Sequence, residues 1–72
     1  MPIQELGNDQ YFFSDPEAQL LSDTLYTAGM EEAMDMVESV LPLPTNHRVI
    51  ELVFNHTYRI NGTDERGVLV YT

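Results

Sequence analysis

Proline and glycine determine where helices can form in this chain. Pro16 follows a Ser-Asp pair, Gly29 lies thirteen residues later, and Pro42 and Pro44 follow within another fifteen. Proline is tolerated in the first turn of a helix, whereas the residue before a proline is pushed towards extended backbone. Helical structure is therefore expected between Pro16 and about Leu41, interrupted near Gly29, and strands are expected outside that window.

The first predicted helix begins at Ser14-Asp15-Pro16-Glu17. In this pattern Ser14 or Asp15 caps the helix, Pro16 occupies the first helical position, and Glu17 completes a capping-box spacing with Ser14. The residues that then follow helical spacing are Leu20, Leu21, Thr24, Leu25 and Ala28. Gly29 is a typical C-terminal stop.

A second helical pattern starts at Met30. Its apolar face consists of Met30, Ala33, Met34 and Val37, and its opposite face of Glu31, Glu32, Asp35 and Glu38. Periodicity leaves two alternatives open for residues 38–41, which either finish this helix or begin a strand.

Strands are predicted mainly in the C-terminal part of the chain. Residues 1–13 are expected to be an entry segment whose Tyr11-Phe12-Phe13 forms a short strand or an anchor on the core. Residues 48–54 favour a strand, with a short helix as the alternative, and residues 57–60 lead into Asn61-Gly62, a strong hairpin signal. With a closing strand at 67–72, the prediction is one α+β domain, residues 1–72, with one or two N-terminal helices packed on a small antiparallel sheet.

The chain is better suited to binding than to catalysis. It has 72 residues and no cysteine, so neither a disulfide nor a thiolate metal site can stabilise it. A domain of this size gains only about 3–5 kcal/mol from its core, and a deep catalytic cleft is difficult to hold on so small a body. No nucleophile pattern accompanies His47 or His56, and no glycine loop suits a phosphate. We therefore expect no enzyme activity, no cofactor and no metal, and we interpret the acidic helix face as solvated because it lacks the spacing of a calcium loop.

Charge is distributed very unevenly along the sequence. The net charge is −9, from twelve acids, three arginines and no lysine. Nine acids lie within residues 1–47, which contain no Lys or Arg, while the remaining three acids balance Arg48, Arg59 and Arg66. Such a field repels nucleic acid and membranes and attracts basic clefts. The expected partner is a protein with a basic DNA-binding groove, although acidity that serves only solubility is the alternative.

Localisation is expected to be cytoplasmic. No secretory signal is readable near Glu5 and Asp9, no apolar run approaches the length of a membrane span, and the absence of cysteine fits a reducing compartment.

Residues 38–44, Glu-Ser-Val-Leu-Pro-Leu-Pro, resemble the phage-encoded uracil-DNA glycosylase inhibitors. That family carries a Glu-Ser-aliphatic-Leu strand followed one residue later by Leu-Pro. Further similarity lies upstream in residues 21–25 and downstream in residues 56–57, 63–65 and 68–70, in the family's order. The family fold, an antiparallel sheet with two helices, agrees with the α+β prediction, and membership would place the protein in the host-cell cytoplasm.

The resemblance implies a stoichiometric inhibitor that mimics DNA and occupies the glycosylase groove. Its partner-binding residues would be Glu38, Ser39, Val40 and Leu41, with Asp23, Glu31, Glu32, Asp35, Asp64 and Glu65 imitating peripheral phosphates. A glycosylase inserts an apolar wedge into DNA. The candidates for an apolar pocket that receives it are Met34, Val37, Leu41, Val49, Val53, Leu69 and Val70.

Two other functions remain open at this point. One is a DNA mimic that inhibits a different defence enzyme, such as a restriction or CRISPR nuclease, which the acidity supports equally well. The other is a regulatory module without enzyme activity, such as an antitoxin, which would depend on its partner for folding.

Overall fold

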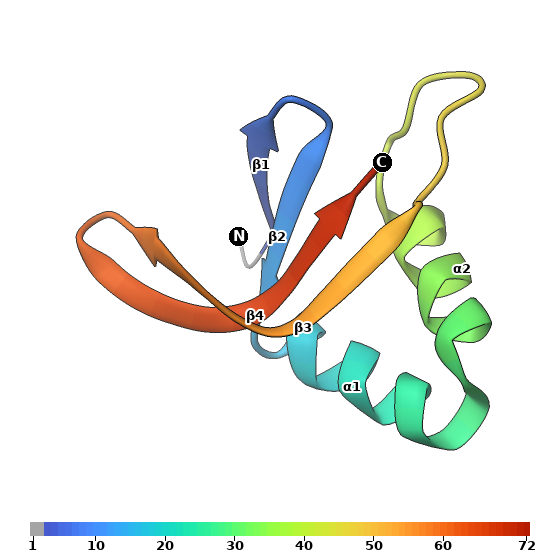
Figure 1. Ribbon diagram of the computed structural model, residues 1–72, viewed down its shortest axis with the longest axis horizontal. Coiled ribbons are helices and arrows are strands. Elements are labelled where there is room, and N and C mark those ends of the chain that lie inside the picture. Colours follow the sequence, from blue (N-terminus) through green and yellow to red (C-terminus); the bar gives the residue numbers. More distant parts are fainter. Residues whose placement is uncertain (1–2) are drawn as a thin grey trace.

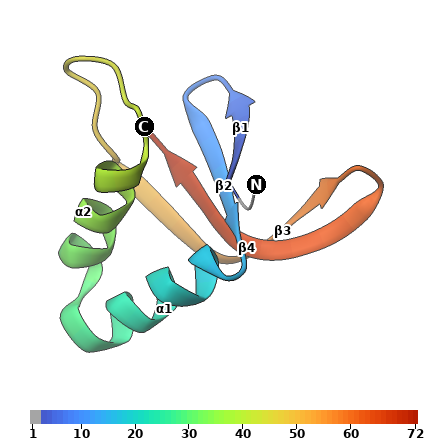
Figure 2. The ribbon, with the colours of Figure 1, turned by 180° about the vertical axis from the view of Figure 1, so that it is seen from behind.

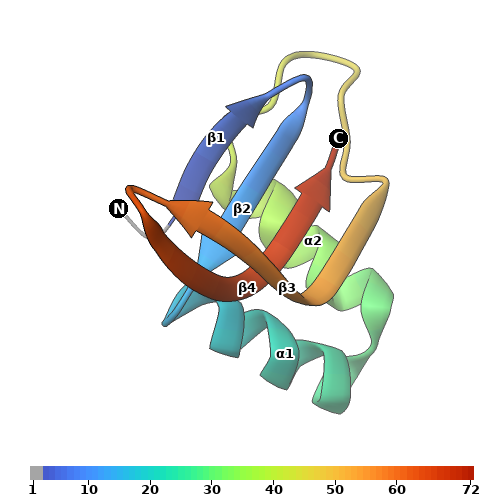
Figure 3. The same ribbon diagram turned by 60° about the vertical axis from the view of Figure 1, so that its left-hand side comes forward.

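The computed structural model describes residues 3–72. Its elements in chain order are β1 (Ile3–Gly7), β2 (Gln10–Ser14), α1 (Glu17–Ala28), α2 (Met30–Val40), β3 (Glu51–Ile60) and β4 (Thr63–Tyr71). The strands form one antiparallel sheet in the order β1-β2-β4-β3, and both helices lie on one side of it (Figures 1 and 3). The predicted α+β class is confirmed, and the two predicted helices follow β1 and β2 in the chain.

The N-terminal segment contributes a complete hairpin. Asn8 and Asp9 both have positive φ, 52° and 62°, and turn β1 back into β2. Short polar residues such as these tolerate left-handed backbone. Tyr11-Phe12-Phe13 forms the strand that was one of the two predicted alternatives, and β2 also pairs with β4, with Phe13 opposite Val68. The expected entry segment thus supplies the edge strand β1 and the interior strand β2, while residues 1–2 lie outside the described chain.

The helix boundaries follow the glycine and prolines closely. Helix α1 begins at Glu17, and Pro16 occupies the N-cap position, which the prediction gave to Ser14 or Asp15, so the predicted start of the helix is wrong. Gly29, at φ 96°, ends α1 with its N–H directed at the carbonyls of Leu25 and Thr24. Its positive φ is a conformation that glycine adopts without a Cβ clash. Residues 38–40 form the last turn of α2, which settles the open alternative in favour of a helix end.

The second hairpin is longer than predicted. Strand β3 begins at Glu51, three residues later than expected, because residues 41–50 form a loop after the prolines, and the helical alternative for 48–54 is excluded. A bulge between Val53 and His56, where Asn55 has φ 58°, joins the two predicted strands into one. Asn61 (φ 53°) and Gly62 (φ 82°) make the predicted turn.

Adjacent residues of β2 point to opposite faces of the sheet and build two apolar layers. Phe13 belongs to the main core, which the small helix residues Ala18, Leu21, Ala33 and Val37 cover. Phe12 is equally buried, but on the other face, where its ring lies 5.5 Å from that of Tyr58 and 6.3 Å from that of His56. The far half of the β3–β4 hairpin bends towards that face (Figure 3).

Gly67 makes this close packing possible. A Cβ at that position would lie 2.0 Å from the backbone oxygen of Phe13 and 2.9 Å from the ring of Phe12. The approach of β2 to β4 therefore requires a residue without a side chain.

Candidate acidic interface

The acids of residues 1–47 lie mostly on the surface. Seven of the nine are exposed, namely Glu5, Asp9, Asp15, Asp23, Glu31, Glu32 and Asp35, while Glu17 and Glu38 are half-buried. Within residues 3–72 the single ion pair joins Arg59 Nε to Asp64 Oδ1 at 3.0 Å, and it lies in the C-terminal hairpin. The acids on the helices are therefore not neutralised by ion pairing among the described residues.

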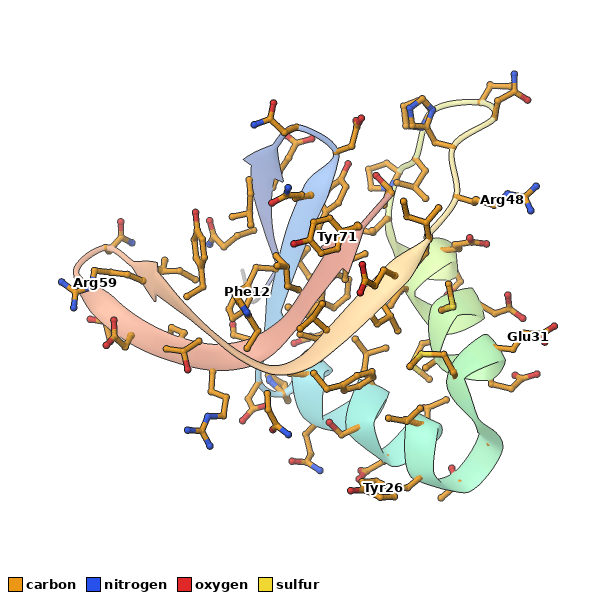
Figure 4. The ribbon with its side chains drawn as sticks, in the orientation of Figure 1. Phe12, Tyr26, Glu31, Arg48, Arg59 and Tyr71 are labelled. Atoms are coloured by element: carbon orange, nitrogen blue, oxygen red, sulfur yellow. The ribbon has the colours of Figure 1, made fainter. Side chains whose placement is uncertain are left out.

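Helix α2 carries the densest group of acids. Glu31 and Glu32 lie in its first turn, where the positive end of the helix dipole favours negative charge. Asp35 lies one turn further on, on the same side as Glu31. Glu31, Asp35 and Glu38 line one wall of a groove between α2 and the 41–50 loop, whose other wall includes His47 and Arg48. Glu31 and Arg48 both project outward on this side of the molecule (Figure 4).

Glu38 has a role within the fold. Its Oε2 accepts a hydrogen bond of 2.8 Å from the backbone N–H of Val49, eleven residues later. Val49 itself is buried in the core. A carboxylate that accepts a backbone N–H makes a charge-assisted bond, stronger than one between neutral groups. Glu38 therefore ties the 41–50 loop to α2, so its removal is expected to affect folding in addition to the partner binding proposed for it.

The other residues of the predicted Glu-Ser segment point in different directions. The Ser39 hydroxyl donates to the backbone oxygen of Met36 at 2.7 Å, Val40 is 54% exposed, and Leu41 is buried in the core. In the resembled family this segment is a strand, whereas here Glu38, Ser39 and Val40 are helical. The strand that the resemblance implies at this segment is therefore absent, and the helix end, the other open alternative, is observed.

The residues predicted to line an apolar pocket fill the interior instead. Val37, Leu41, Val49 and Val70 belong to the main core. Leu69 is buried, and Met34 and Val53 are half-buried. Helical and alternating spacing selects buried residues in general and does not distinguish a core from an open pocket. Of these residues, Met34 and Val49 also line the groove between α2 and the 41–50 loop.

Asp64 and Glu65 lie away from the acids of the helices. They are next to the β3–β4 turn, at the opposite end of the molecule from α2 (Figures 1 and 2). The labelled side chains of Arg59 and Glu31 mark these two ends in Figure 4. The structure thus brings Glu31, Glu32 and Asp35 together on one helix and leaves Asp64 and Glu65 outside that group.

Some exposed apolar side chains of the helices, Leu20 and Met36 among them, were not among the predicted partner-binding residues. Leu20 (56% exposed), Met36 (36%) and Val40 (54%) lie on the helices. Helix geometry could have identified them from the sequence. Leu20 precedes the core residue Leu21 and Met36 precedes Val37, and neighbouring residues of a helix point about 100° apart around its axis. Val40 had been singled out only as part of the Glu-Ser segment.

Elsewhere the surface offers little for chemistry. Burial raises the pKa of Tyr11, and the nearby carboxylate of Glu5, 3.4 Å from its hydroxyl, raises it further. Among residues 3–72 no group of three His, Asp or Glu side chains is arranged to hold a metal ion. In the same part of the chain, neither helix combines the length and apolar character required to traverse a bilayer.

Comparison with known proteins gives no relative to guide the interpretation. The chain matches no protein-family model, no curated protein and no solved structure. A functional interpretation therefore depends on the residues of this chain alone.

Proposed function

We propose that this protein binds the basic DNA-binding groove of another protein as an acidic DNA mimic and inhibits it stoichiometrically, with uracil-DNA glycosylase as the first target to test. The observation that carries the proposal is the group of exposed acids on the helices, without a Lys or Arg before Arg48. A groove built for phosphates presents Lys and Arg side chains that neutralise the phosphate charges. Carboxylates can take the place of those phosphates.

The exposed acids of α2 are the strongest candidates for the contact. Glu31, Glu32 and Asp35 have no ion-pair partner within the described chain, so a basic groove does not have to displace an internal cation. Glu38, by contrast, is already bonded to Val49 and is better placed to support the surface than to enter the groove. Long-range attraction of this kind raises the association rate and weakens as salt screens it.

The test is uracil excision from labelled DNA by purified glycosylase, with increasing amounts of this protein. We expect inhibition that is complete near one-to-one stoichiometry and an association rate that falls as salt rises. Full glycosylase activity in a several-fold molar excess of folded protein would falsify the choice of target. The same titration against a restriction nuclease and a CRISPR nuclease then decides whether another DNA-binding enzyme is the target.

A matched pair of triple variants tests the proposed surface. Glu31→Gln, Glu32→Gln and Asp35→Asn together remove three charges from α2. Glu51→Gln, Asp64→Asn and Glu65→Gln remove the same charge from the C-terminal hairpin. We expect the first variant to lose most of the inhibition and the second to keep it, since the proposed contact involves the acids of α2 and not those of the C-terminal hairpin. Equal losses would mean that net charge alone matters and that no particular face is used. Circular dichroism and a thermal melt confirm that each variant is folded.

A further inference from the structure

An apolar strip crosses the two helices between their acids. It consists of Leu20 and Thr24 on α1 and of Met36 and Val40 on α2. The members of each pair are one helical turn apart and therefore share a helix face. The Thr24 hydroxyl joins the pairs, since it donates to the Leu20 carbonyl at 2.9 Å and lies 3.6 Å from the Met36 sulfur. The strip is thus one surface built from both helices.

The strip is open to solvent, and acids flank it. Leu20 and Val40 are both more than half exposed. Asp23 precedes Thr24 in the chain, and Glu32 lies one turn before Met36 on the same side of α2; both acids are exposed. An apolar surface with a charged rim has the general composition of a protein-binding site.

We infer that this strip receives an apolar side chain of the partner that is flanked by Lys or Arg residues. The inference rests on the proposed function and adds an apolar contact, which salt does not screen. Charge decides between possible occupants. A second copy of this chain would bring Asp23 and Glu32 against the same acids, and anionic lipid head groups would be repelled as well. A basic segment with an apolar centre satisfies both the strip and its rim.

Methionine is well suited to such a contact. Met36 is flexible and polarisable, so it can adapt to the shape of an incoming side chain. Burying one leucine-sized side chain of the partner is favourable relative to leaving it exposed to water. Part of that gain is lost in ordering the partner. An increase in affinity of about tenfold is therefore expected from the apolar contact.

The experiment uses two short lysine-rich peptides that differ only at the centre, where one carries leucine and the other serine. Calorimetry at low salt measures the binding of each peptide to the intact protein. We expect both to bind, with the leucine peptide about tenfold tighter. The double variant Met36→Gln, Val40→Thr should remove the advantage of leucine and leave the affinity for the serine peptide unchanged.

Ile50→Thr is the matched control, because Ile50 is a β-branched residue that is 65% exposed outside the strip. It should leave the leucine advantage intact. Equal affinity of the two peptides for the unmodified chain would contradict the inference that the strip binds an apolar side chain, but it would leave the charge-based proposal standing. The inference would also be contradicted if Ile50→Thr lost the tighter binding of the leucine peptide. Failure of both peptides to bind would overturn the strip and the recognition of basic segments together.

Discussion

The helix pair and the C-terminal hairpin differ in the side chains that they bury and in the charges that they expose. The helix pair (α1 and α2, residues 17–40) buries mainly Ala18, Leu21, Ala33 and Val37, which are small or medium-sized. Strands β2, β3 and β4 bury larger or more numerous side chains, namely Phe12, Phe13, Leu52, Val68, Leu69 and Val70. The sheet therefore supplies most of the apolar volume of the interior.

Charge follows the same division. The helix pair contains six acids and no cation, whereas residues 48–72 contain three acids and three arginines, one of which forms the ion pair with Asp64. A helix packed on one side leaves a wide outer surface that the fold does not specify. The comparison indicates that the sheet stabilises the molecule while the helix pair is free to present an acidic surface.

The largest expected effect tests whether the sheet carries the stability. Phe12→Ala removes a fully buried ring from the second face of the sheet. Such a truncation costs about 3–5 kcal/mol, comparable to the whole stability expected of a domain this size. Urea denaturation should show a largely unfolded variant. Tyr26→Ala, on an aromatic that is 89% exposed on α1, should change stability by less than about 0.5 kcal/mol. Similar losses for both would contradict the comparison.

The second prediction is that Glu38 contributes to the stability of the fold, whereas the neighbouring acids of α2 do not. Glu38→Ala leaves the Val49 N–H without its acceptor and should reduce the free energy of unfolding by about 1–3 kcal/mol. Glu38→Gln keeps an acceptor oxygen and should restore part of the loss. Glu32→Ala, on the exposed side of α2, should have little effect. Hydrogen exchange at the Val49 amide measures the loosening of the loop directly. An unchanged exchange rate in Glu38→Ala would contradict this role.

The third prediction is that removing one acid changes the stability of the protein in opposite directions in the two regions. Asp35 is one turn from Glu31, Glu32 and Glu38, so Asp35→Asn removes like-charge pairs and should stabilise the protein by about 0.2–0.5 kcal/mol for each pair. Asp64→Asn breaks the pair with Arg59 and should destabilise it by less than about 1 kcal/mol, because both side chains are exposed. Thermal melts at low salt measure both changes, and added salt should shrink them. If both variants were stabilised or both destabilised, the uneven distribution of charge between the two regions would have no effect on stability.

The smallest effect concerns pH at the β1–β2 hairpin. Burial and the Glu5 carboxylate raise the pKa of Tyr11 above its ordinary value of 10.0. The unfolded chain then loses the phenolic proton first, so this contribution to stability is complete below pH 10.0 and is lost as pH rises through the pKa of the folded state. Ring resonances of Tyr11 followed by NMR should titrate above 10.0 and shift downward in Glu5→Gln. A Tyr11 pKa at or below that value would refute the prediction.

Local chemistry in the sequence determined most of the secondary structure. Gly29 and the prolines marked the helix ends, because their backbone limits act wherever they stand. Asn61-Gly62 marked a turn for the same reason, and both of its residues have positive φ in the structure. The Gly7-Asn8-Asp9 turn carried a similar signal that was not used, and the β1–β2 hairpin was therefore predicted only as an entry segment with one possible strand.

Tertiary structure decided what periodicity leaves open. Spacing alone identified Val37, Leu41, Val49 and Val70 as apolar positions, but only packing placed them in the core instead of an exposed pocket. Glu38 belongs to the same acidic pattern as Glu31 and Asp35, yet its bond to Val49 spans a loop that no local rule specifies.

The charge asymmetry was fully determined by the sequence, because it depends only on which residues are present and in what order. The separation of Asp64 and Glu65 from the acids of α2 was decided by the antiparallel β3–β4 hairpin, which carries its turn to the far end of the molecule. Likewise, Leu20 and Met36 are sixteen residues apart in the chain and share a surface only because Gly29 turns one helix against the other. Composition sets the charges and apolar groups that a chain possesses, whereas long-range packing sets which of them face the same partner.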